Sequence, residues 1–302
     1  MANQFVQNVI NMIKNEFGSL KSIGDSYSLY QILSNGALIY FRYSKLTDRR
    51  KMQSGFYGLR KEDIAMLSGK NSFICFVWDK FENPLLIPFI NFEYCFGLFP
   101  PSSDGQYKAH IYFKPSGTEF YLANVGKFNV DSYFGLSQLY EIGKYKLAVP
   151  DLSHTQVQSL LGAIGLKKGF DLWYPENDKY KMDSQIIDYS KVRNSLPNFS
   201  FEIDNIISEI DCIWMQNSKP ISFFEVEHST PIYSGLLRFN DVLLTIGGVD
   251  NFNIVANNVR ESKFSREINR PTFKQNKLID KVTFLDYENI YHWYYNLYGK
   301  IY

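Results

Sequence analysis

The amino-acid sequence predicts an α/β (α+β) protein with two domains. In residues 1–147 one helical pattern precedes a series of strand patterns, whereas in residues 150–302 helical and strand patterns alternate. Between them, residues 148–151 are Ala-Val-Pro-Asp, which suits a linker that leads into a helix. We expect an N-terminal helix with a mostly antiparallel sheet, and a C-terminal mixed central sheet flanked by helices.

The N-terminal half begins with apolar residues at helical spacing over residues 5–17. A second, short helix is expected over residues 61–67. Between the two helices we expect a strand and then a polar, basic loop that contains residues 45–51, followed by Gly55-Phe56-Tyr57-Gly58-Leu59-Arg60. The expected strands alternate with turn-forming residues and cover 37–43, 72–78, 84–89, 107–113 and 119–125.

The C-terminal half is expected to begin with a helix that Ser153 caps and that ends at Gly165. A polar, loop-like stretch covers 175–200. The remaining expected elements, in chain order, are strands at 170–174, 210–214 and 221–227, a helix at 229–244, a strand at 252–256 and a helix at 259–268. This order predicts a mixed sheet with helices on both faces.

Composition restricts the functional classes. No apolar run approaches the ~20 residues of a membrane span, and the first residues lack a secretion signal, so we expect a cytoplasmic protein without a membrane partner. Cys75, Cys95 and Cys212 are far apart in apolar surroundings, which indicates reduced, buried thiols. The net charge of +1 means that any binding of nucleic acid must depend on local basic clusters.

Three acidic residues are the most informative feature. Glu225 and Glu227 are two apart on an expected strand and therefore point to one face, and Asp211 begins the strand before it. If the two strands form a hairpin, the three carboxylates approach one another and are best accommodated around a divalent cation. Such a site is suited to phosphodiester hydrolysis. The alternative is a surface hairpin with solvated glutamates.

The Asp…Glu-x-Glu arrangement and the element order resemble the PD-(D/E)XK nuclease superfamily. An extended series over about residues 150–295 resembles a bacterial group of type II restriction-endonuclease-like proteins. Its segments are His154-Thr155-Gln156-Val157-Gln158, Gly169-Phe170-Asp171-Leu172-Trp173, Asn177-Asp178, Ile210-Asp211-Cys212-Ile213-Trp214, the stretches 224–230 and 232–238, and Asn269-Arg270-Pro271-Thr272-Phe273. Glu227 stands where the superfamily usually has lysine, a variant found in both active and inactive members.

The resemblance implies a Mg²⁺-dependent endonuclease, with Mn²⁺ as a substitute, that acts on double-stranded DNA as a homodimer. Asp211, Glu225 and the carbonyl of Val226 are expected to hold the cation. Glu227 is expected to orient a water molecule, accept its proton or bind a second ion. A second metal ion, Lys219 or Arg238 would then supply the positive charge of the usual lysine. The alternatives are a non-catalytic nucleic-acid-binding or defence-associated protein that retains the fold, and a phosphoesterase acting on RNA.

Several residues have a weaker claim to the site. Gln158 lies on the first helix, where related nucleases often have a polar residue near the metal. Arg238 is expected either to bind phosphate or to pair with Asp241, and His228 to pack or hydrogen-bond rather than to bind the ion. Asp171 and Asp178 are minor candidates, and Trp173 is expected in the core.

The N-terminal domain is expected to recognise DNA, since arginine and lysine bind phosphates and guanine edges. A solvated surface is the alternative, and a second basic region extends from Arg260 to Lys281. The expected contacts are Arg42, Arg49, Arg50, Lys51, Tyr57, Arg60 and Lys61.

Overall fold

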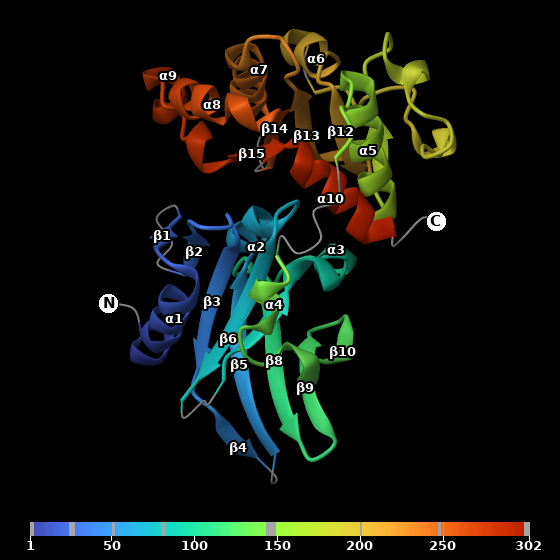
Figure 1. Cartoon of the computed structure of the whole chain (residues 1–302). Coiled ribbons are helices and arrows are strands. Elements are labelled where there is room, and N and C mark those ends of the chain that lie inside the picture. Colours follow the sequence, from blue (N-terminus) through green and yellow to red (C-terminus); the bar gives the residue numbers. More distant parts are fainter. Residues whose placement is uncertain are drawn as a thin grey trace. The chain divides into compact units, whose positions relative to one another are not determined.

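The structure is a computed structural model, and it describes residues 3–23, 28–49, 52–79, 83–142, 149–199, 201–246, 249 and 251–298, with only the backbone at 49, 201 and 202. The chain divides into two compact units, Met1–Leu147 and Ala148–Tyr302. Each unit has its own sheets, helices and hydrophobic core (Figure 1). None of the described helices has both the length and the apolar character needed to cross a membrane.

The first unit contains a mixed five-stranded sheet covered on one face by a helix. The helix is α1 (Gln4–Phe17), whose N-terminus is capped by the side chain of Asn3. Its apolar side, with Val9 and Ile13, packs on the sheet. The strands, in spatial order, are β1 (Leu20–Ser22), β2 (Leu29–Ile32), β3 (Leu38–Ser44), β6 (Ser72–Trp78) and β7 (Leu85–Pro88), with β3 and β6 parallel.

A second, antiparallel sheet packs over the other face, and the larger core of this unit lies between the two sheets. Its strands, in spatial order, are β10 (Gly126–Asn129), β9 (Gly117–Leu122), β8 (Gln106–Lys114), β5 (Met52–Arg60) and β4 (Thr47–Arg49). Short helical segments connect the strands: α2 (Lys61–Leu67), η1 (Phe89–Asn91), α3 (Cys95–Leu98), η2 (Asp131–Tyr133) and α4 (Ser137–Tyr140).

The expected mostly antiparallel character of this unit is confirmed, as are the helices at 61–67 and near 5–17. The expected basic loop at residues 45–51 is wrong at residues 47–49, because they form β4, which pairs with β5. The following residues, for which no strand was expected, form β5. Tyr57 and Leu59 face inward, while the outward residues that alternate with them include Ser54, Gly58 and Arg60, which weaken the apolar signal of the strand.

The second unit is a five-stranded mixed sheet between two helical layers. In spatial order its strands are β11 (Asp171–Trp173), β12 (Cys212–Gln216), β13 (Lys219–Val226), β14 (Phe252–Ala256) and β15 (Val282–Asp286). The β11–β12 and β12–β13 pairs are antiparallel, and the β13–β14 and β14–β15 pairs are parallel. The expected mixed central sheet flanked by helices is therefore confirmed.

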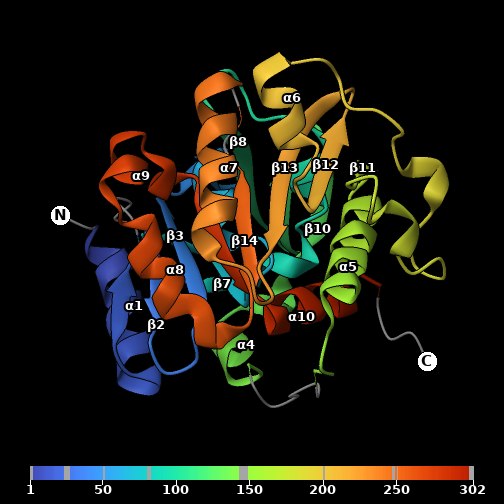
Figure 2. The ribbon, with the colours of Figure 1, turned by 90° about the horizontal axis from the view of Figure 1, so that it is seen from above.

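Residues from α6 (Phe201–Ile207), α7 (Ile232–Thr245), α8 (Glu261–Ile268) and α9 (Pro271–Gln275) join the hydrophobic core on one face of this sheet. On the other face, α5 (His154–Lys167) lies beside α10 (Tyr287–Tyr298) (Figure 2). Trp293 of α10 packs on Trp214 of β12. The remaining short segments are η3 (Lys179–Lys181), η4 (Tyr189–Lys191), η5 (Asn258–Arg260) and η6 (Leu278–Asp280).

The start of α5 is as expected, because Ser153 and Gln156 form a reciprocal capping box. Its expected end at Gly165 is wrong. A Cβ atom at Gly165 would lie 2.5 Å from Nε1 of Trp214, so this glycine permits close packing inside the helix. The helix ends before Gly169, whose φ of +84° is the left-handed conformation that favours glycine.

Candidate active site

The three acidic residues lie at one edge of the second unit's sheet. Glu225 is near the end of β13, Glu227 follows that strand, and Asp211 precedes β12. Because β12 and β13 are antiparallel, the start of one and the end of the other meet at the same edge. The backbone N–H of Val226 donates a 2.7 Å hydrogen bond to Oδ2 of Asp211, which joins the two strands at this point.

Glu225 is fully buried and forms a two-point ion pair with Arg238 of α7. Nε of Arg238 is 2.6 Å from Oε1 of Glu225, and Nη2 is 2.6 Å from Oε2. Burial raises the pKa of Glu225 to about 8, while the guanidinium opposes this shift. Neither expectation for Arg238, phosphate binding or a pair with Asp241, describes its partner here.

Glu227 is buried and only half satisfied. The hydroxyl of Thr230 donates to its Oε2, whereas Oε1 is buried without a hydrogen-bond partner. Burial also raises the pKa of this carboxyl. Arg260 of η5 donates to the carbonyl oxygens of Glu227 and Thr230, and so holds the turn that carries the acid. An unpartnered carboxylate oxygen is able to accept a proton or a cation.

Gly235 allows α7 to lie directly against the acidic residues. A Cβ atom there would be 2.8 Å from Oε1 of Glu227 and 3.2 Å from Cβ and Cγ of Glu225. Because this one Cβ position would approach both side chains, Glu225 and Glu227 lie close together beneath α7. Any larger side chain would displace one of the carboxylates.

A second group of ligands converges on Asp211. In the described part of the chain, His154, Asp178 and Asp211 each offer a ligand atom, and these atoms lie within 4.8 Å of one another. Nε2 of His154 is 3.3 Å from Oδ1 of Asp211, and this contact is the main reason that the pKa of His154 is raised. Glu225, expected as the second metal ligand, does not belong to this group, because Arg238 engages both of its oxygens.

Gln158 lies where the resemblance implied. Its side-chain nitrogen is 3.1 Å from the carbonyl oxygen of Asp211 and 3.5 Å from Oδ1. The Gln158 side chain is fully buried, and its Oε1 has no hydrogen-bond partner. Gln158 therefore orients Asp211 from the side of α5.

A cavity of about 330 Å³ opens at the same edge of the sheet. Asn257 and Asn258 line it from the residues after β14, and Asp286 and Tyr287 from the end of β15 and the start of α10. The parallel strands β13, β14 and β15 all end here, so their following residues gather near Glu227. Val149 to Leu152 form the remaining wall, with Glu288.

Other expected residues lie elsewhere or have structural partners. Nδ1 of His228 is 3.2 Å from the hydroxyl of Tyr287, in agreement with a hydrogen-bonding role. Asp171 pairs with Arg193 at 2.7 Å. Trp173 belongs to the core, as expected. Lys219 begins β13, roughly 20 Å from Glu225 at the strand's rise per residue, so it cannot replace the usual lysine.

The expected DNA contacts of the first unit divide into three groups. Tyr57 is buried and its hydroxyl donates to the carbonyl of Val77, so its ring is not available to DNA. Arg42 is half-buried with its guanidinium over the ring of Tyr40, whereas Arg60 and Lys61 are exposed. The side chain of Arg49 and the whole of Arg50 and Lys51 lie outside the described residues.

Sequence reasoning underrated several site residues: His154, Asp178, Thr230, Gly235 and Arg260. All but Arg260 lie in the series of segments that carries the family resemblance, and this was the sequence feature that could have indicated them. Their spacing does not show that they meet, because Asp178 reaches Asp211 only through the fold of the loop after β11.

If the protein is the Mg²⁺-dependent endonuclease that the resemblance implies, Asp178→Asn is expected to raise the Mg²⁺ concentration that cleavage requires, because an amide oxygen is a poorer ligand than a carboxylate. The apparent affinity for Mg²⁺ should fall by about tenfold or more, the size of effect typical of groups that support a metal site. The measurement is the cleavage rate as a function of Mg²⁺ concentration. Asp188→Asn, at an exposed residue on the same connection, is the matched control. Equal Mg²⁺ dependence in both variants would remove Asp178 from the site.

Comparison with known proteins points to one family. The family model described as the type II restriction enzyme NmeDI C-terminal domain matches residues 142–298. The type II restriction enzyme NmeDI of Neisseria meningitidis serogroup C is 34% identical over 136 residues. That alignment covers 40% of this chain and 37% of the relative, so well under two thirds of the relative is spanned. No solved structure matches the chain.

The matched region includes the acidic residues of the candidate site, Asp178, Asp211, Glu225 and Glu227. The same region contains α5 and the five strands of the second unit's sheet. It also includes more than half of the chain. The chain therefore belongs to the family of the type II restriction enzyme NmeDI C-terminal domain.

Proposed function

We propose that this protein is a metal-dependent endonuclease that hydrolyses phosphodiester bonds in double-stranded DNA, as a type II restriction endonuclease of the bacterial cytoplasm. Its site is proposed to be a PD-(D/E)XK variant in which Glu227 takes the place of the usual lysine. The observation that supports this most strongly is the set of Asp211, Glu225 and Glu227 at one sheet edge, with one oxygen of Glu227 buried and unpartnered. Acidic residues that gather at a buried position, with the pKa values of Glu225 and Glu227 raised, are typical of a functional site rather than of a purely structural one.

The residues present fit a divalent cation. Asp211 belongs to two groups of possible ligands. The first is the pair with Glu225, where a hydrogen bond from Val226 to Asp211 holds β12 and β13 together. The second is the group with His154 and Asp178, whose ligand atoms lie close to Asp211. Mg²⁺ prefers a few carboxylates and keeps several waters, which the partly exposed side of Asp211 permits. Imidazole suits Mn²⁺ better than Mg²⁺, in line with Mn²⁺ as a substitute. The carbonyl oxygen of Val226, an expected ligand, accepts a hydrogen bond from the backbone N–H of His228. It would therefore be shared between this hydrogen bond and the cation.

The protein's own groups divide the remaining work. The bound cation supplies Lewis-acid stabilisation of the charge that develops on the scissile phosphate. Glu227 accepts a proton from the attacking water at Oε1, whose raised pKa suits it to a general base. Arg238 supplies the positive charge that lysine provides elsewhere, and it balances the buried charge of Glu225. Arg260 and Thr230 position Glu227.

The experiment that tests the function is incubation of the purified protein with phage DNA, with and without Mg²⁺, followed by gel electrophoresis. Discrete fragments that require Mg²⁺ are expected for a restriction enzyme. A smear would indicate a nuclease without sequence specificity. Binding without any cleavage would favour the alternative of a non-catalytic DNA-binding protein, and cleavage of RNA alone would favour a ribonuclease.

Two-fold symmetric cutting of both strands is best served by a homodimer, which we also propose. Sedimentation of the protein on a duplex that contains the cleaved sequence tests this. Two protomers for each duplex are expected, and one protomer for each duplex would favour sequential nicking by a monomer.

Mg²⁺ should stabilise the protein more at about pH 8.5 than at about pH 6. Burial raises the pKa of Glu225 from 4.5 to about 8 and also raises that of Glu227. Between pH 4.5 and about 8 the unfolded Glu225 is ionised while the folded one retains its proton, so the metal-free protein loses stability as pH rises. The raised pKa of Glu227 acts in the same direction. A cation competes with those protons, and it therefore binds more tightly at high pH and restores the lost stability.

The measurement is the midpoint of thermal unfolding in Mg²⁺ and in EDTA at several pH values. The difference between the two midpoints is expected to grow with pH. A difference that is constant across the range would show that the ion binds away from the buried glutamates.

Basic residues of the first unit are proposed to bind DNA phosphates. Removal of charge at Arg49, Arg50 and Lys51 together is expected to weaken DNA binding without changing the affinity for Mg²⁺. Each lost phosphate contact should flatten the salt dependence of binding by about one unit of slope. The measurement is a titration of DNA at several salt concentrations with Ca²⁺ in place of Mg²⁺. Unchanged affinity and slope would leave Arg42, Arg60, Lys61 or the Arg260 region as the alternatives.

A further inference from the structure

One face of the antiparallel sheet in the first unit carries aromatic residues that point away from the core. Inward residues such as Tyr57, Ile111 and Phe120 fill the core between the two sheets. The residues that alternate with them point to the opposite face. We call this the aromatic face, and its members are Phe56, His110, Tyr112, Tyr121 and Lys127.

Four of these residues form one row across four strands. Phe56 of β5 pairs with His110 of β8, His110 with Tyr121 of β9, and Tyr121 with Lys127 of β10. With neighbouring strands about 4.8 Å apart, the row extends over about 14 Å. This is comparable to the width over which four-stranded sheets stack two or three unpaired bases.

The rings of the aromatic face lie in mutual contact. The centroids of Phe56 and His110 are 5.1 Å apart, and His110 stacks on Tyr112 at 5.4 Å with an angle of 1° between the ring planes. Tyr121 is 6.0 Å from His110 and 6.1 Å from Tyr112. Phe56 is 50% exposed, so the cluster is open to solvent at the β5 end. Burial lowers the pKa of His110, which keeps the imidazole uncharged.

Positive charge surrounds the aromatic residues. The ammonium of Lys127 lies 5.7 Å from the ring centroid of Tyr112, and Arg60 is exposed on β5. Lys108 and Lys114 of β8 also point outward, each paired with one acid, Asp104 and Glu119. The described residues of this face and its edge thus have four cations, Arg60, Lys108, Lys114 and Lys127, against three carboxylates, Asp104, Glu119 and Asp131. This imbalance favours a polyanion over an apolar protein partner.

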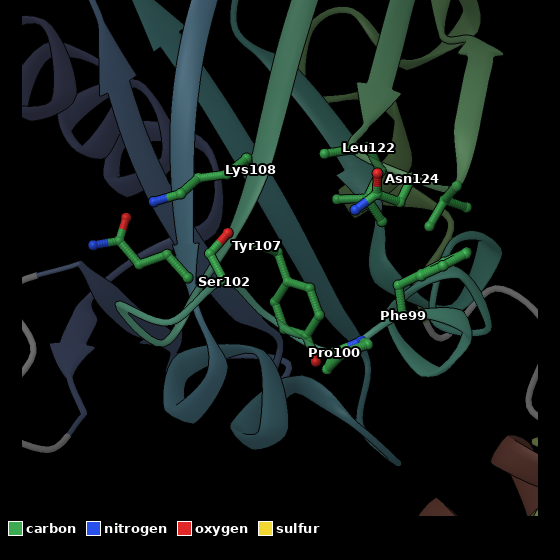
Figure 3. Close-up of a pocket in the computed structure, with 10 residues that line it drawn as sticks. Phe99, Pro100, Ser102, Tyr107, Lys108, Leu122 and Asn124 are labelled. Atoms are coloured by element: carbon green, nitrogen blue, oxygen red, sulfur yellow. The ribbon is translucent and has the colours of Figure 1, made fainter.

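A cavity at one end of this sheet is too small to hold a base. It is lined by Phe99, Tyr107, Lys108 and Asn124 among others (Figure 3). Its volume of about 30 Å³ is enough for one or two water molecules. This cavity therefore cannot take a base, whereas the aromatic face is open at Phe56.

We propose that the aromatic face binds single-stranded DNA by stacking unpaired bases on Phe56 and Tyr121, with Lys127 and Arg60 at the phosphates. Stacking on aromatic side chains requires only the flat faces of the bases, so it tolerates any sequence. The flanking cations suit a sugar–phosphate backbone that follows the row. This site lies wholly in the first unit and does not depend on the nuclease proposed for the second.

The test uses the full-length protein in EDTA, so that cleavage does not interfere. Fluorescence anisotropy measures the binding of a labelled oligo-dT, a duplex of equal length and an oligo-U. Oligo-dT is expected to bind most tightly. Phe56→Ala and Tyr121→Ala should each weaken its binding by about 5- to 150-fold, the range typical for loss of one stacked base. Tyr121→Phe should retain binding, because the ring remains.

Tyr180→Ala, at an exposed tyrosine of the second unit, is the matched control and should leave oligo-dT binding unchanged. Lys127→Gln replaces an exposed side chain and tests the face even if the alanine variants fail to fold. It should flatten the salt dependence by about 0.7 unit of slope, whereas Lys21→Gln on β1 should not.

Four results would overturn the proposal. They are no binding of oligo-dT, equal binding by the variants of the aromatic face and the control, tighter binding of the duplex or of oligo-U through the same residues, and loss of a dimer in Tyr121→Ala without DNA. The last would assign the aromatic face to a second copy of the chain. Failure of DNA cleavage in the Mg²⁺ assay would leave this proposal untouched.

Discussion

Asp211→Asn is expected to abolish DNA cleavage while DNA binding is retained. Asp211 is the residue shared by both ligand groups, and asparagine has the same shape but no charge. Loss of a group that only supports a metal ligand costs about 10- to 100-fold, so loss of the ligand itself should exceed about 100-fold. Asparagine can still accept the hydrogen bond from the N–H of Val226, so the fold should persist.

The measurement is the rate of DNA cleavage in Mg²⁺, with binding followed separately in Ca²⁺. Asp171→Asn is the control, because that acid pairs with Arg193 outside the site. Glu225→Gln and Glu227→Gln should behave as Asp211→Asn does. Glu227→Gln is the sharper of these two, because its unpartnered Oε1 is the proposed proton acceptor. Wild-type cleavage by the Asp211 variant would reject the proposed site.

At about pH 9, above the raised pKa of Glu225, Arg238→Met should destabilise the second unit strongly, by more than the loss of any of the exposed ion pairs. It leaves Glu225 buried without the guanidinium that occupies both of its oxygens. Breaking a buried ion pair from one side typically costs about 3–5 kcal/mol. Because Arg238 is itself partly exposed, we expect a loss of about 3 kcal/mol.

The double variant Arg238→Met/Glu225→Gln should recover much of this loss, since no charge then remains buried. The loss in the single variant should also shrink at about pH 5, below the raised pKa of Glu225, where this carboxyl carries a proton. Arg270→Met is the control. Its pair with Glu267 is exposed, and its removal should change the stability by less than about 0.5 kcal/mol.

Urea unfolding followed by tryptophan fluorescence measures this effect in the correct unit. Three of the four tryptophans, Trp173, Trp214 and Trp293, lie in the second unit, so a Trp78→Phe background removes the signal of the first. Equal stability of Arg238→Met and the parent protein would contradict a buried charge at Glu225.

Local sequence patterns were sufficient for elements whose apolar period or caps are strong. The strands at 72–78 and 252–256 are almost wholly buried, so their apolar runs are unbroken. The start of α5 was predictable because Ser153 and Gln156 cap it through contacts only three residues apart. Elements without an expectation include β1, β2, β10, α6, α9, β15 and α10. Five of the 12 residues of α10 are tyrosine, which has no strong helical propensity, and this segment is helical here through packing of Trp293 on Trp214.

The sequence by itself determined which acids are paired on one face and which family the chain resembles, because both depend on spacing along short segments. Only the tertiary structure decided the partners of those acids. The Glu225–Arg238 pair depends on how α7 lies against β13, which Gly235 permits. The meeting of His154, Asp178 and Asp211 joins three segments distant in the chain. Contacts of this kind depend on packing between elements, for which the spacing of residues in one sequence carries no direct signal.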